Sequence, residues 1–513
     1  MGRKENQTSL MELCWNLTES LQSEAVSTLF GKSEIPFRSE ERGFLGIIYA
    51  GTGIRRRSLF LGKIVKQEAK WVYDGQHGLS FSPRYFSRAL DEVSLAPAGA
   101  GMIIVHSHPF PTESINSPPN PSNPDLKHEK KLLFYVGKSL QRGAPLASGI
   151  ITPNGAWRVR EYQWKEVTLG SPGAYNKNFT YQDASITRII SSDKLEVIKH
   201  YTSSKSRIHA KAQDSTIRLW GEEGQAVIGN MRVGIAGLGG VGSILVEFLA
   251  RLGVGELILV DFDVVGIENM NRLVGAKLSD IGRPKIKYAK RIAMEAATSK
   301  NFKLTTFRGS VAEKDGLERL LDSDVIMNAA DSAFARQVLD HVAYSFEVPV
   351  IDGGSTFIPA ENIRGMRGKS QVSIAGPGFP CLECSGVYSQ EEATLAREDN
   401  TDFNQPKYII AKGLPEERPP QRNPSVISYN GLVASIMIQR FLGLTLGFPP
   451  DRKIGQQRYY VEEGILNWGP VVRCEPGCQK SSWIGLGDSH YVPIGIDLNW
   501  QKMRQSSNRK SDK

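Results

Sequence analysis

The glycine-rich segment Gly237–Gly242 could hold a phosphate group. It follows the apolar run Met231–Ala236, which predicts a strand, and it precedes Ser243–Leu252, which predicts a helix. Glycines let backbone N–H groups approach a phosphate at the N-terminus of a helix. A second apolar run, Leu257–Val260, ends at Asp261, whose carboxylate could hold a ribose hydroxyl. This order predicts a nucleotide site on a strand–turn–helix–strand unit, but the glycine motif alone suits any nucleotide.

Charged residues further along the chain narrow the chemistry. Arg272 is followed by Lys285 and then by Asp331. A dinucleotide dehydrogenase, which transfers hydride, does not need two cations and an extra acid at this spacing. Attack on the α-phosphate of ATP adds negative charge at phosphorus, and fixed cations stabilise that charge. We therefore expect an enzyme that attacks the α-phosphate rather than a dehydrogenase.

A second group of residues could hold a metal ion. The apolar run Gly101–Val105 predicts a buried strand that leads into His106 and His108. Alternation along a strand puts both imidazoles on one face, and Asp125, near the start of an expected helix, adds a carboxylate. Three protein ligands leave the fourth position of a zinc ion open for water, whose pKa zinc lowers to about 7. Glu41, at the edge of an early strand, could take a proton from that water.

The chain has five cysteines, and four of them form two close pairs. Two residues separate Cys381 from Cys384, and three separate Cys474 from Cys478. Two such pairs can supply four thiolates for a closed, structural zinc site. Cys14 stands apart on a helical pattern and is expected to be a core residue. The small number and paired spacing of the cysteines indicate a reducing compartment rather than disulfide bonds.

Length and composition indicate a soluble protein of several domains. The 513 residues suffice for two or three domains, each with its own core. No apolar run is long enough for a membrane span, and the N-terminus lacks the apolar core of a signal peptide. The net charge is +9, of which the last 13 residues supply +4 (five Lys or Arg less one Asp) without any nucleic-acid-binding motif. We expect a cytoplasmic protein with no membrane or nucleic-acid partner.

The elements that must position these residues divide the chain into five parts. Residues 1–35 are expected to form a helical cap, because Leu10, Leu13, Leu17 and Leu21 recur at helical spacing. Then follow a compact α/β unit (36–161), a polar linker with one or two short helices (162–212), the nucleotide unit (213–480) and a basic tail (481–513). In the compact unit we expect strands at Gly43–Ala50, Ser58–Val65, Gly101–His106 and Ala147–Thr152, and helices at Ser82–Val93 and Asp125–Leu140.

The first unit resembles the JAMM/MPN (JAB) metallopeptidases, which share an upstream Glu, a His-x-His-Pro motif and a Ser-x-x-Asp motif. The resemblance implies an α/β domain that cuts peptide or isopeptide bonds after the C-terminal glycine of ubiquitin-like proteins. It makes Glu41 the general acid/base and Ser122 the residue that steadies the tetrahedral intermediate. It also implies that the catalytic Zn²⁺ is bound by His106, His108 and Asp125.

One feature departs from the pattern of that family. The loop Phe110–Pro124 contains five prolines and makes the gap between His108 and Asp125 longer than usual. A shorter register, with Ser117 and Asn120, also exists, but Asn is a poor replacement for the acid. The alternative is that the His-x-His motif is structural and the domain only binds the modifier.

Residues 213–480 resemble the ThiF/MoeB-like, ubiquitin-activating superfamily. The shared motifs follow in family order: Leu219–Gln225, the glycine loop, Asp261-x-Asp263, Asn269-x-x-Arg272, Gly282-x-Pro284-Lys285 and Asp331–Arg336. The resemblance implies a Rossmann-like adenylation domain, often with a structural zinc site. It implies ATP binding by Gly237, Gly239, Gly240, Gly242, Asp261, Asp263, Asn269, Arg272, Lys285 and Asp331, with Asp331 holding Mg²⁺ and with Arg272 and Lys285 also catalytic.

Members of this superfamily usually build their adenylation sites in dimers, so a homodimer is expected. They commonly place an Arg shortly before the Trp-Gly pair, where it reaches the partner's ATP. Ser215 stands near that place here, and Arg218 could replace the arginine. The family often has Gln where this chain has Leu273.

Many ubiquitin-activating enzymes also carry a cysteine that takes the acyl group as a thioester. No cysteine lies between Cys384 and Cys474, so the domain has no free thiol if its four cysteines bind zinc. The chain would then stop at the acyl-adenylate, or another nucleophile would act. Ser425, just before the expected helix Asn430–Phe441, is a candidate, although we favour a helix N-cap or loop role for it.

Together the two resemblances imply a fusion that serves a bacterial ubiquitin-like pathway, of the kind found in conjugation-like operons that include antiphage defence. One unit, with ATP and Mg²⁺, would activate a β-grasp protein, and the deubiquitinase-like unit would trim or remove it. A conjugating-enzyme-like relay protein would be a further partner. The alternative is a sulfur-carrier pathway for cofactor or metabolite synthesis.

Overall fold

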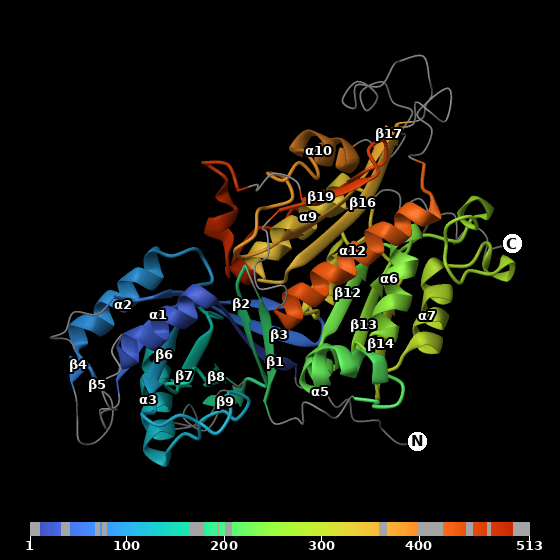
Figure 1. Ribbon diagram of the computed structural model, residues 1–513. Coiled ribbons are helices and arrows are strands. Elements are labelled where there is room, and N and C mark those ends of the chain that lie inside the picture. Colours follow the sequence, from blue (N-terminus) through green and yellow to red (C-terminus); the bar gives the residue numbers. More distant parts are fainter. Residues whose placement is uncertain are drawn as a thin grey trace, which may run out of the picture. The chain divides into compact units, whose positions relative to one another are not determined.

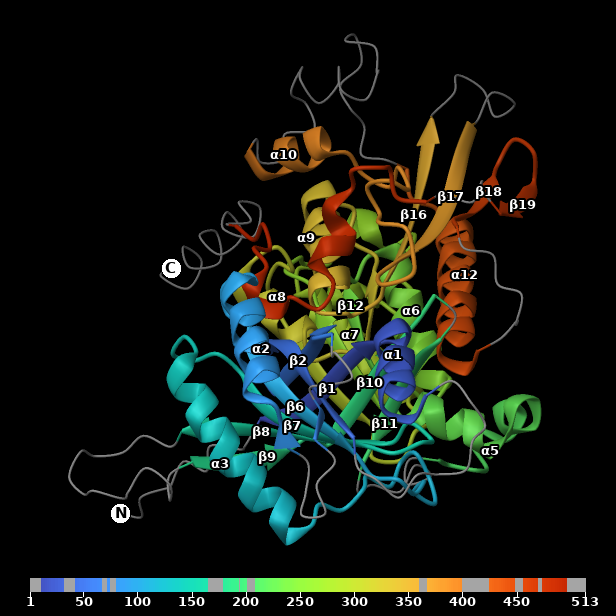
Figure 2. The ribbon, with the colours of Figure 1, turned by 90° about the vertical axis from the view of Figure 1, so that its left-hand side faces the viewer.

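The structure is a computed structural model, and Figures 1 and 2 show it in two views. It describes residues 11–31, 42–66, 72–73, 80–164, 179–192, 194–200, 208–358, 367–398, 424–447, 455–468 and 473–495. The chain forms two compact units. The first consists of Met1–Ile189, Ile198–Tyr201 and Gly485–His490, and the second of the remaining residues.

A nine-stranded sheet is the frame of the first unit, in the order β11-β10-β1-β3-β2-β6-β7-β8-β9, although Ile190 of β10 and Leu195–Val197 of β11 are assigned to the second unit. Its strands are β1 (Glu12–Thr18), β2 (Gly43–Thr52), β3 (Arg56–Ile64), β6 (Gly101–Ser107), β7 (Leu146–Ile151), β8 (Trp157–Trp164), β9 (Phe179–Asp183), β10 (Ile186–Ile190) and β11 (Leu195–Lys199). The helices are α1 (Glu19–Phe30), α2 (Pro83–Leu95) and α3 (Asn123–Ser139), and β4 (Val72–Tyr73) pairs with β5 (Ser80–Phe81). The expected strands and helices of the compact unit agree with β2, β3, β6, β7, α2 and α3 to within a few residues.

Helices cover both faces of this sheet (Figure 2). Alternate residues of β6 enter two different cores: Ile103 and Val105 pack with α1, and Met102 and Ile104 pack with α2 and α3. Strand side chains point to opposite faces in turn, so a residue's place in β6 determines which helices it meets. This alternation positions the histidines that follow.

The expected N-terminal helical cap differs from the structure. Leu13, Trp15 and Leu17 lie on β1, inside the sheet, and their side chains are buried in the core beneath α1. A spacing of four residues fits a strand face as well as a helix face, because it is a multiple of two. The helix begins only at Glu19, where Thr18 caps it. Cys14, on the same strand, is buried as expected.

The expected linker and tail also differ. Residues 162–212 contain the end of β8 and all of β9, β10 and β11, so part of this segment belongs to the sheet. Polar residues dominate it because several positions of these strands are partly exposed, as in the burial pattern of β9. Within residues 481–513, the short helix η7 (Gly487–Ser489) packs against β2, where Asp488 Oδ1 accepts a hydrogen bond from the amide of Thr52 at 3.4 Å.

The second unit has an eight-stranded sheet in the order β14-β13-β12-β15-β16-β17-β18-β19. Its strands are β12 (Arg232–Ala236), β13 (Glu256–Val260), β14 (Lys303–Phe307), β15 (Val325–Asn328), β16 (Val350–Ile358), β17 (Arg367–Ala375), β18 (Gln457–Tyr460) and β19 (Ile465–Trp468). Its helices are α5 (Asp214–Asn230), α6 (Gly240–Arg251), α7 (Lys285–Ala296), α8 (Lys314–Leu320), α9 (Ala333–Ser345), α10 (Gln390–Glu398) and α12 (Ile427–Leu446). Short helices are η3 (Ile267–Asn269), η4 (Leu278–Asp280) and η6 (Gln479–Trp483).

The parallel half of this sheet forms a nucleotide-binding topology. Strands β14, β13, β12, β15 and β16 are parallel, and α12, α6 and α7 lie side by side on one face (Figure 1). The strand order reverses at β12, since the chain goes next to β13 on one side and later to β15 on the other. Ligands of such sheets bind at the carboxyl ends of the strands, where the order reverses. The predicted strand, turn, helix and strand around the glycine loop agree with β12, α6 and β13.

No helix in the described parts of the chain combines the length and the apolar character needed to cross a bilayer.

Candidate functional site

Strand β6 and helix α3 bring together the three candidate metal ligands of the first unit. His106 continues the row of Met102 and Ile104, which face α3, and His108 follows the end of the strand. Asp125 is the third residue of α3. The carboxyl end of β6 therefore meets the first turn of this helix, and both imidazoles lie near Asp125.

Ser122 fixes the position of Asp125. Its hydroxyl oxygen accepts a hydrogen bond from the amide of Asp125 at 3.2 Å, and its own amide donates to Asp125 Oδ2 at 2.7 Å. This reciprocal pair is a capping box, which satisfies amides left free at the start of a helix. The Ser-x-x-Asp spacing thus has a structural reason in addition to the catalytic role expected for Ser122.

The three side chains fit a metal ion. The Nε2 atoms of His106 and His108 each lie 3.8 Å from Oδ2 of Asp125, and one ligand atom from each residue falls within 4.8 Å of the others. His106 Nε2 is buried and has no hydrogen-bond partner among the described residues. A buried polar atom without a partner is costly, and a metal ion at this point would satisfy it. Two imidazoles and a carboxylate suit zinc with one open position.

The protonation states of two of these ligands favour a cation. Burial lowers the pKa of His106 to about 4, so the imidazole is neutral at neutral pH and its lone pair is free. Burial by itself raises the pKa of Asp125, but His108 and the hydrogen bonds from Ser122 lower it well below its usual range. The set therefore offers a neutral imidazole and a charged carboxylate.

Two other sequence predictions have different outcomes. Glu41 lies outside the described residues. In the shorter register, Oδ1 of Asn120 is occupied by Arg158, since it accepts a hydrogen bond from Nη1 of that residue at 3.1 Å. Geometry thus favours Asp125 over Asn120.

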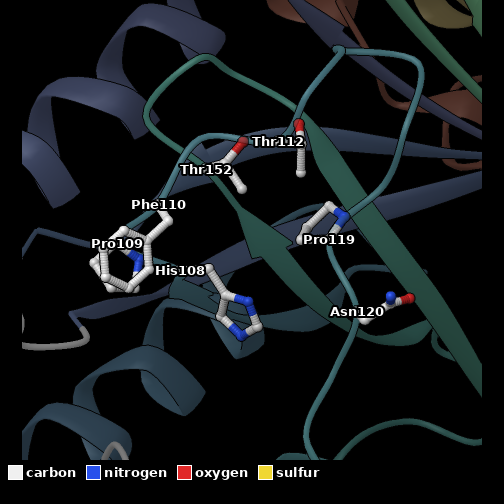
Figure 3. Close-up of a pocket in the computed structure, with 7 residues that line it drawn as sticks. All are labelled: His108, Pro109, Phe110, Thr112, Pro119, Asn120 and Thr152. Carbon is white, nitrogen blue, oxygen red and sulfur yellow. The ribbon is translucent and has the colours of Figure 1, made fainter.

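The long loop after His108 forms one wall of an open pocket of about 390 Å³. Figure 3 shows Pro109 and Phe110 beside His108, Pro119 and Asn120 across from them, and two threonines between. The lining residues are His108, Pro109, Phe110, Thr112, Pro119, Asn120 and Thr152. Nδ2 of Asn154 donates to the carbonyl oxygen of Thr112 at 3.1 Å and so ties this loop to the β7–β8 turn. The expectation of an irregular loop agrees with the structure. The loop lies beside His108, one of the candidate metal ligands.

The sequence prediction missed Glu129, a buried carboxylate of α3 that lies one helical turn after Asp125. Its Oε1 is 3.6 Å from Nδ1 of His106. The sequence did contain a signal for Glu129, because residues spaced like Asp125 and Glu129, at i and i+4, share a helix face.

In the second unit, the glycine loop joins β12 to α6. Gly237 has a φ of 86°, and a Cβ atom there would lie 2.8 Å from the amide of Ala330. A Cβ atom on Gly242 would lie 2.0 Å from the carbonyl oxygen of Gly237, so this glycine allows the helix to pack on the loop. A Cβ atom on Gly239 would meet nothing within 4 Å. Gly239 therefore borders open space at the N-terminus of α6, where a phosphate could approach.

Three charged residues gather at the carboxyl end of β13. Asp261 accepts hydrogen bonds from the amides of Leu238, in the glycine loop, at 2.6 Å and of Asp263 at 2.7 Å. Lys285, the first residue of α7, places Nζ 2.8 Å from Oδ2 of Asp263. Burial lowers the pKa of Lys285, but Asp261 and Asp263 raise it above its usual value, so the ammonium stays charged. The resemblance assigned these three residues to one site, and the structure brings them together.

Asp331 follows the end of β15, the strand beside β12 at the point where the strand order reverses. It is exposed, and its charge also raises the pKa of Lys285. Its carbonyl oxygen accepts a hydrogen bond from Nη1 of Arg336 at 3.4 Å, and Nε of Arg336 bonds to the buried Asp352 at 3.1 Å. An exposed carboxylate near the glycine loop can bind a magnesium ion, which prefers oxygen ligands.

Asn269 and Arg272 make contacts within their own loop. Asn269 is buried, and its Oδ1 accepts a hydrogen bond from the amide of Gly266 at 3.0 Å. Arg272 Nη1 donates to the carbonyl oxygen of Glu268 at 2.6 Å and to Asn271 Oδ1 at 3.2 Å. The structure thus does not join these two side chains to Asp261, Asp263 and Lys285.

Ser425 lies against the glycine loop. Nδ2 of Asn430 donates to Ser425 Oγ at 3.1 Å, and a Cβ atom on Gly240 would lie 2.1 Å from that Nδ2 and 3.4 Å from that Oγ. No base hydrogen-bonds to Ser425 in the described part of the chain. The N-cap of α12 is Val426, so of the two expected roles, N-cap or loop serine, Ser425 has the second.

The four paired cysteines converge, with their sulfur atoms within 4.8 Å of one another. The amide of Cys384 donates to Sγ of Cys381 at 3.2 Å, and the amide of Cys381 donates to Sγ of Cys474 at 3.3 Å. A hydrogen bond from Cys381 lowers the pKa of Cys474 to about 5, which favours a thiolate. Four sulfurs at this separation, with amides directed at them, fit a tetrahedral zinc ion with no open position.

Arg218, the candidate for the missing arginine, pairs with Asp214 of its own helix at 3.0 Å, and its side chain is 79% exposed. An arginine this exposed, near the start of α5, is accessible to another chain.

The fold and the glycine loop define a nucleotide-binding α/β domain. Residues 212–467 match the model of the ThiF family, and this part of the chain is a ThiF-family domain. The matched residues do not include the first unit. Any function of that unit must be inferred from the geometry of its candidate metal ligands.

Three curated relatives illustrate the range of this similarity. The molybdopterin-synthase adenylyltransferase of Escherichia coli is 29% identical over 178 residues, which cover 34% of this chain and 67% of that protein. The SAMP-activating enzyme E1 of Haloferax volcanii is 29% identical over 175 residues, covering 34% and 60%. The tRNA threonylcarbamoyladenosine dehydratase of Bacillus subtilis is 50% identical over 74 residues, covering 14% and 29%. The matches span about a third of this chain or less, and at most about two thirds of these relatives.

Proposed function

We propose that the ThiF-family domain adenylates the C-terminal glycine of a ubiquitin-like protein, using ATP and Mg²⁺. The observation that carries this proposal is the charged Lys285, held 2.8 Å from Asp263 beside the glycine loop. A fixed cation next to a phosphate-binding turn suits a reaction in which charge develops at the α-phosphate. One of the three relatives is named an adenylyltransferase and another is named an activating enzyme.

The residues have distinct roles in this proposal. The glycine loop would hold the phosphates through backbone amides, with the open side of Gly239 toward them. Asp261 would hold the ribose, and Asp331 would bind Mg²⁺. The carboxylate of the modifier would attack the α-phosphate, and pyrophosphate would leave while Lys285 stabilises the added charge. Arg272 would have to turn away from Glu268 and Asn271 to reach the phosphates.

We propose for the first unit a zinc-dependent peptidase or isopeptidase activity on the same modifier. It is supported by the buried Nε2 of His106, which lacks a partner and lies 3.8 Å from Asp125. Zinc held by His106, His108 and Asp125 would supply a nucleophilic water at neutral pH and polarise the scissile carbonyl. The pocket beside His108 would receive the substrate chain, and Ser122 would hold Asp125 in place.

A separation-of-function experiment tests both proposals. His106→Ala should abolish cleavage of a modifier carrying a C-terminal extension but leave ATP–pyrophosphate exchange intact. Lys285→Ala should do the reverse. Loss of both activities in either variant would argue against two independent sites. Cleavage that survives His106→Ala would refute the peptidase assignment and leave a domain that only binds the modifier.

The product of the adenylation reaction distinguishes conjugation from sulfur-carrier activation. Beyond the four clustered cysteines the sequence has only Cys14, which is buried in the first unit. We infer that the chain stops at the acyl-adenylate, because the side chain hydrogen-bonded to Ser425 in the described part of the chain is the amide of Asn430, which is not a base. Intact mass analysis after incubation with Mg-ATP and a glycine-terminated modifier tests this. An adduct on the enzyme that hydroxylamine removes, and that Ser425→Ala lacks, would overturn the inference and favour a relay to conjugation. A C-terminal thiocarboxylate on the modifier would favour sulfur transfer.

A further inference from the structure

We propose that Glu129 is a positioning residue that orients His106 toward the metal; this inference depends on the metal site proposed above. Glu129 and Asp125 lie one turn apart on α3 and face the two nitrogens of the same ring. Asp125 Oδ2 is 3.8 Å from Nε2, and Glu129 Oε1 is 3.6 Å from Nδ1. The imidazole of His106 therefore lies between two carboxylates of one helix.

The Glu129 carboxylate is held in place by a buried network. Nη2 of Arg160 contacts both carboxylate oxygens at 2.7 Å, and the hydroxyl of Tyr162 donates to Oε2 at 3.1 Å. Nε of Arg160 donates to Ser148 Oγ at 3.2 Å. Glu129 is 3% exposed and Arg160 is fully buried. Burial and the charge of Glu129 both raise the pKa of Tyr162, so its hydroxyl keeps the proton that it donates.

This network determines which nitrogen of His106 can bind a metal. A neutral imidazole carries one proton, and a carboxylate beside Nδ1 favours placing that proton there. Nε2 then presents its lone pair toward Asp125 and His108. Metal-binding histidines commonly donate their other N–H to a carboxylate, and loss of such a partner typically costs about 10- to 100-fold in metal affinity. The ion pair of Glu129 with Arg160 thus has a use beyond stabilising the fold.

Paired substitutions separate this role from a merely structural one. Removing Glu129 alone would leave Arg160 buried without its partner, which is strongly destabilising. The informative variants therefore change both residues. Glu129→Met with Arg160→Met removes the charges and the acceptor, whereas Glu129→Gln with Arg160→Met removes the charges but keeps an acceptor oxygen. The matched control is Arg57→Met with Glu161→Met, because that pair is also partly or fully buried and Glu161 points to the opposite face of β8.

The experiment measures Zn²⁺ affinity of the full-length chain by competition with a chromophoric chelator, together with thermal unfolding. The His106→Ala variant gives the contribution of the cysteine site, which is subtracted. We expect the Met/Met variant to bind zinc at the histidine site about 10- to 100-fold more weakly. The Gln/Met variant and the control should stay within a few-fold of the unchanged chain, and the cysteine site should be unaffected.

Two results would overturn the inference. The first is unchanged affinity at the histidine site in a folded Met/Met variant. The second is an equal loss in the Arg57/Glu161 control, which would mean that any lost ion pair has this effect. If instead His106→Ala binds as much zinc as the unchanged chain, the metal site itself is absent and the proposed peptidase fails with it.

Discussion

Nζ of Lys285 lies 2.8 Å from Oδ2 of Asp263. Lys285 is the first residue of α7, and Asp263 follows the carboxyl end of β13. The lysine is 9% exposed, and its amide also donates to the carbonyl oxygen of Asp263 at 2.8 Å. Two contacts between the same residues fix the start of α7 to the end of the strand. A positive charge is thereby held in place beside the glycine loop before any nucleotide binds, as electrostatic stabilisation of a transition state requires.

Lys285→Ala should lower the rate of ATP–pyrophosphate exchange at least about 100-fold, because a fixed charge at the reacting phosphate is lost. Lys287→Ala removes an exposed lysine from the same turn of α7 and should leave the rate unchanged. Exchange measured with both variants checks this. Equal rates for the two variants would contradict the role of Lys285.

Two glycines of the phosphate loop should respond differently to alanine. Gly239→Ala should leave thermal unfolding almost unchanged and weaken ATP binding, since its Cβ would occupy open space next to the loop. Gly242→Ala should destabilise the domain by about 1–3 kcal/mol, since its Cβ would lie 2.0 Å from the carbonyl oxygen of Gly237. Unfolding curves and ATP titrations of both variants check this. Normal ATP affinity in a folded Gly239→Ala protein would show that phosphates do not approach there.

The metal-free first unit should lose stability in mild acid. The pKa of His106 is about 4 in the folded chain against 6.5 for the ordinary side chain. Between pH 6.5 and 4 the unfolded chain binds a proton that the folded chain does not, so stability falls as the pH falls through this window. The full effect is about 3 kcal/mol. Denaturant unfolding with a chelator present, with His106→Gln for comparison, measures it. Identical pH dependence of the two proteins would contradict the burial of a neutral His106.

Removal of the second metal should destabilise the ThiF-family domain. Cys384→Ala takes one of four thiolates from a closed site, and metal binding at such sites contributes directly to folding. We expect a lower unfolding midpoint and one zinc fewer per chain by elemental analysis. Cys14→Ala, at a buried cysteine outside the cluster, should keep the zinc content. A Cys384→Ala protein with full zinc content would argue against a tetrathiolate site.

Local patterns in the sequence predicted the parts of the fold that depend on local rules. The run Leu257–Val260 and the glycine turn mark β13 and the start of α6, because strands of a parallel sheet are apolar and glycine allows the close approach of the loop. Leu13 and Leu17 misled the prediction, because their spacing fits a strand and a helix equally. Strands β9 and β11 have partly exposed faces, so their composition resembles that of a linker, whereas β10 between them is buried.

In the candidate sites, too, local patterns predicted some contacts, whereas contacts between distant segments could not be predicted. His106 and His108 could be paired from sequence because alternation along one strand is local. The spacing of Glu129 from Asp125 shows that both lie on one helix face, but the contact of Glu129 with His106 depends on how α3 packs across β6 and β8. The neighbourhood of Ser425 and Gly240 likewise joins segments almost 200 residues apart, which no local spacing reveals.

Adenylation of the modifier is tested most directly by ATP–pyrophosphate exchange with Mg-ATP and a β-grasp protein that ends in glycine. The same protein without its terminal glycine, and Lys285→Ala enzyme, serve as controls. We expect exchange with the intact protein and background exchange in both controls. Exchange that does not depend on the terminal glycine, or that survives in Lys285→Ala, would contradict adenylation of the modifier's C-terminus at this site.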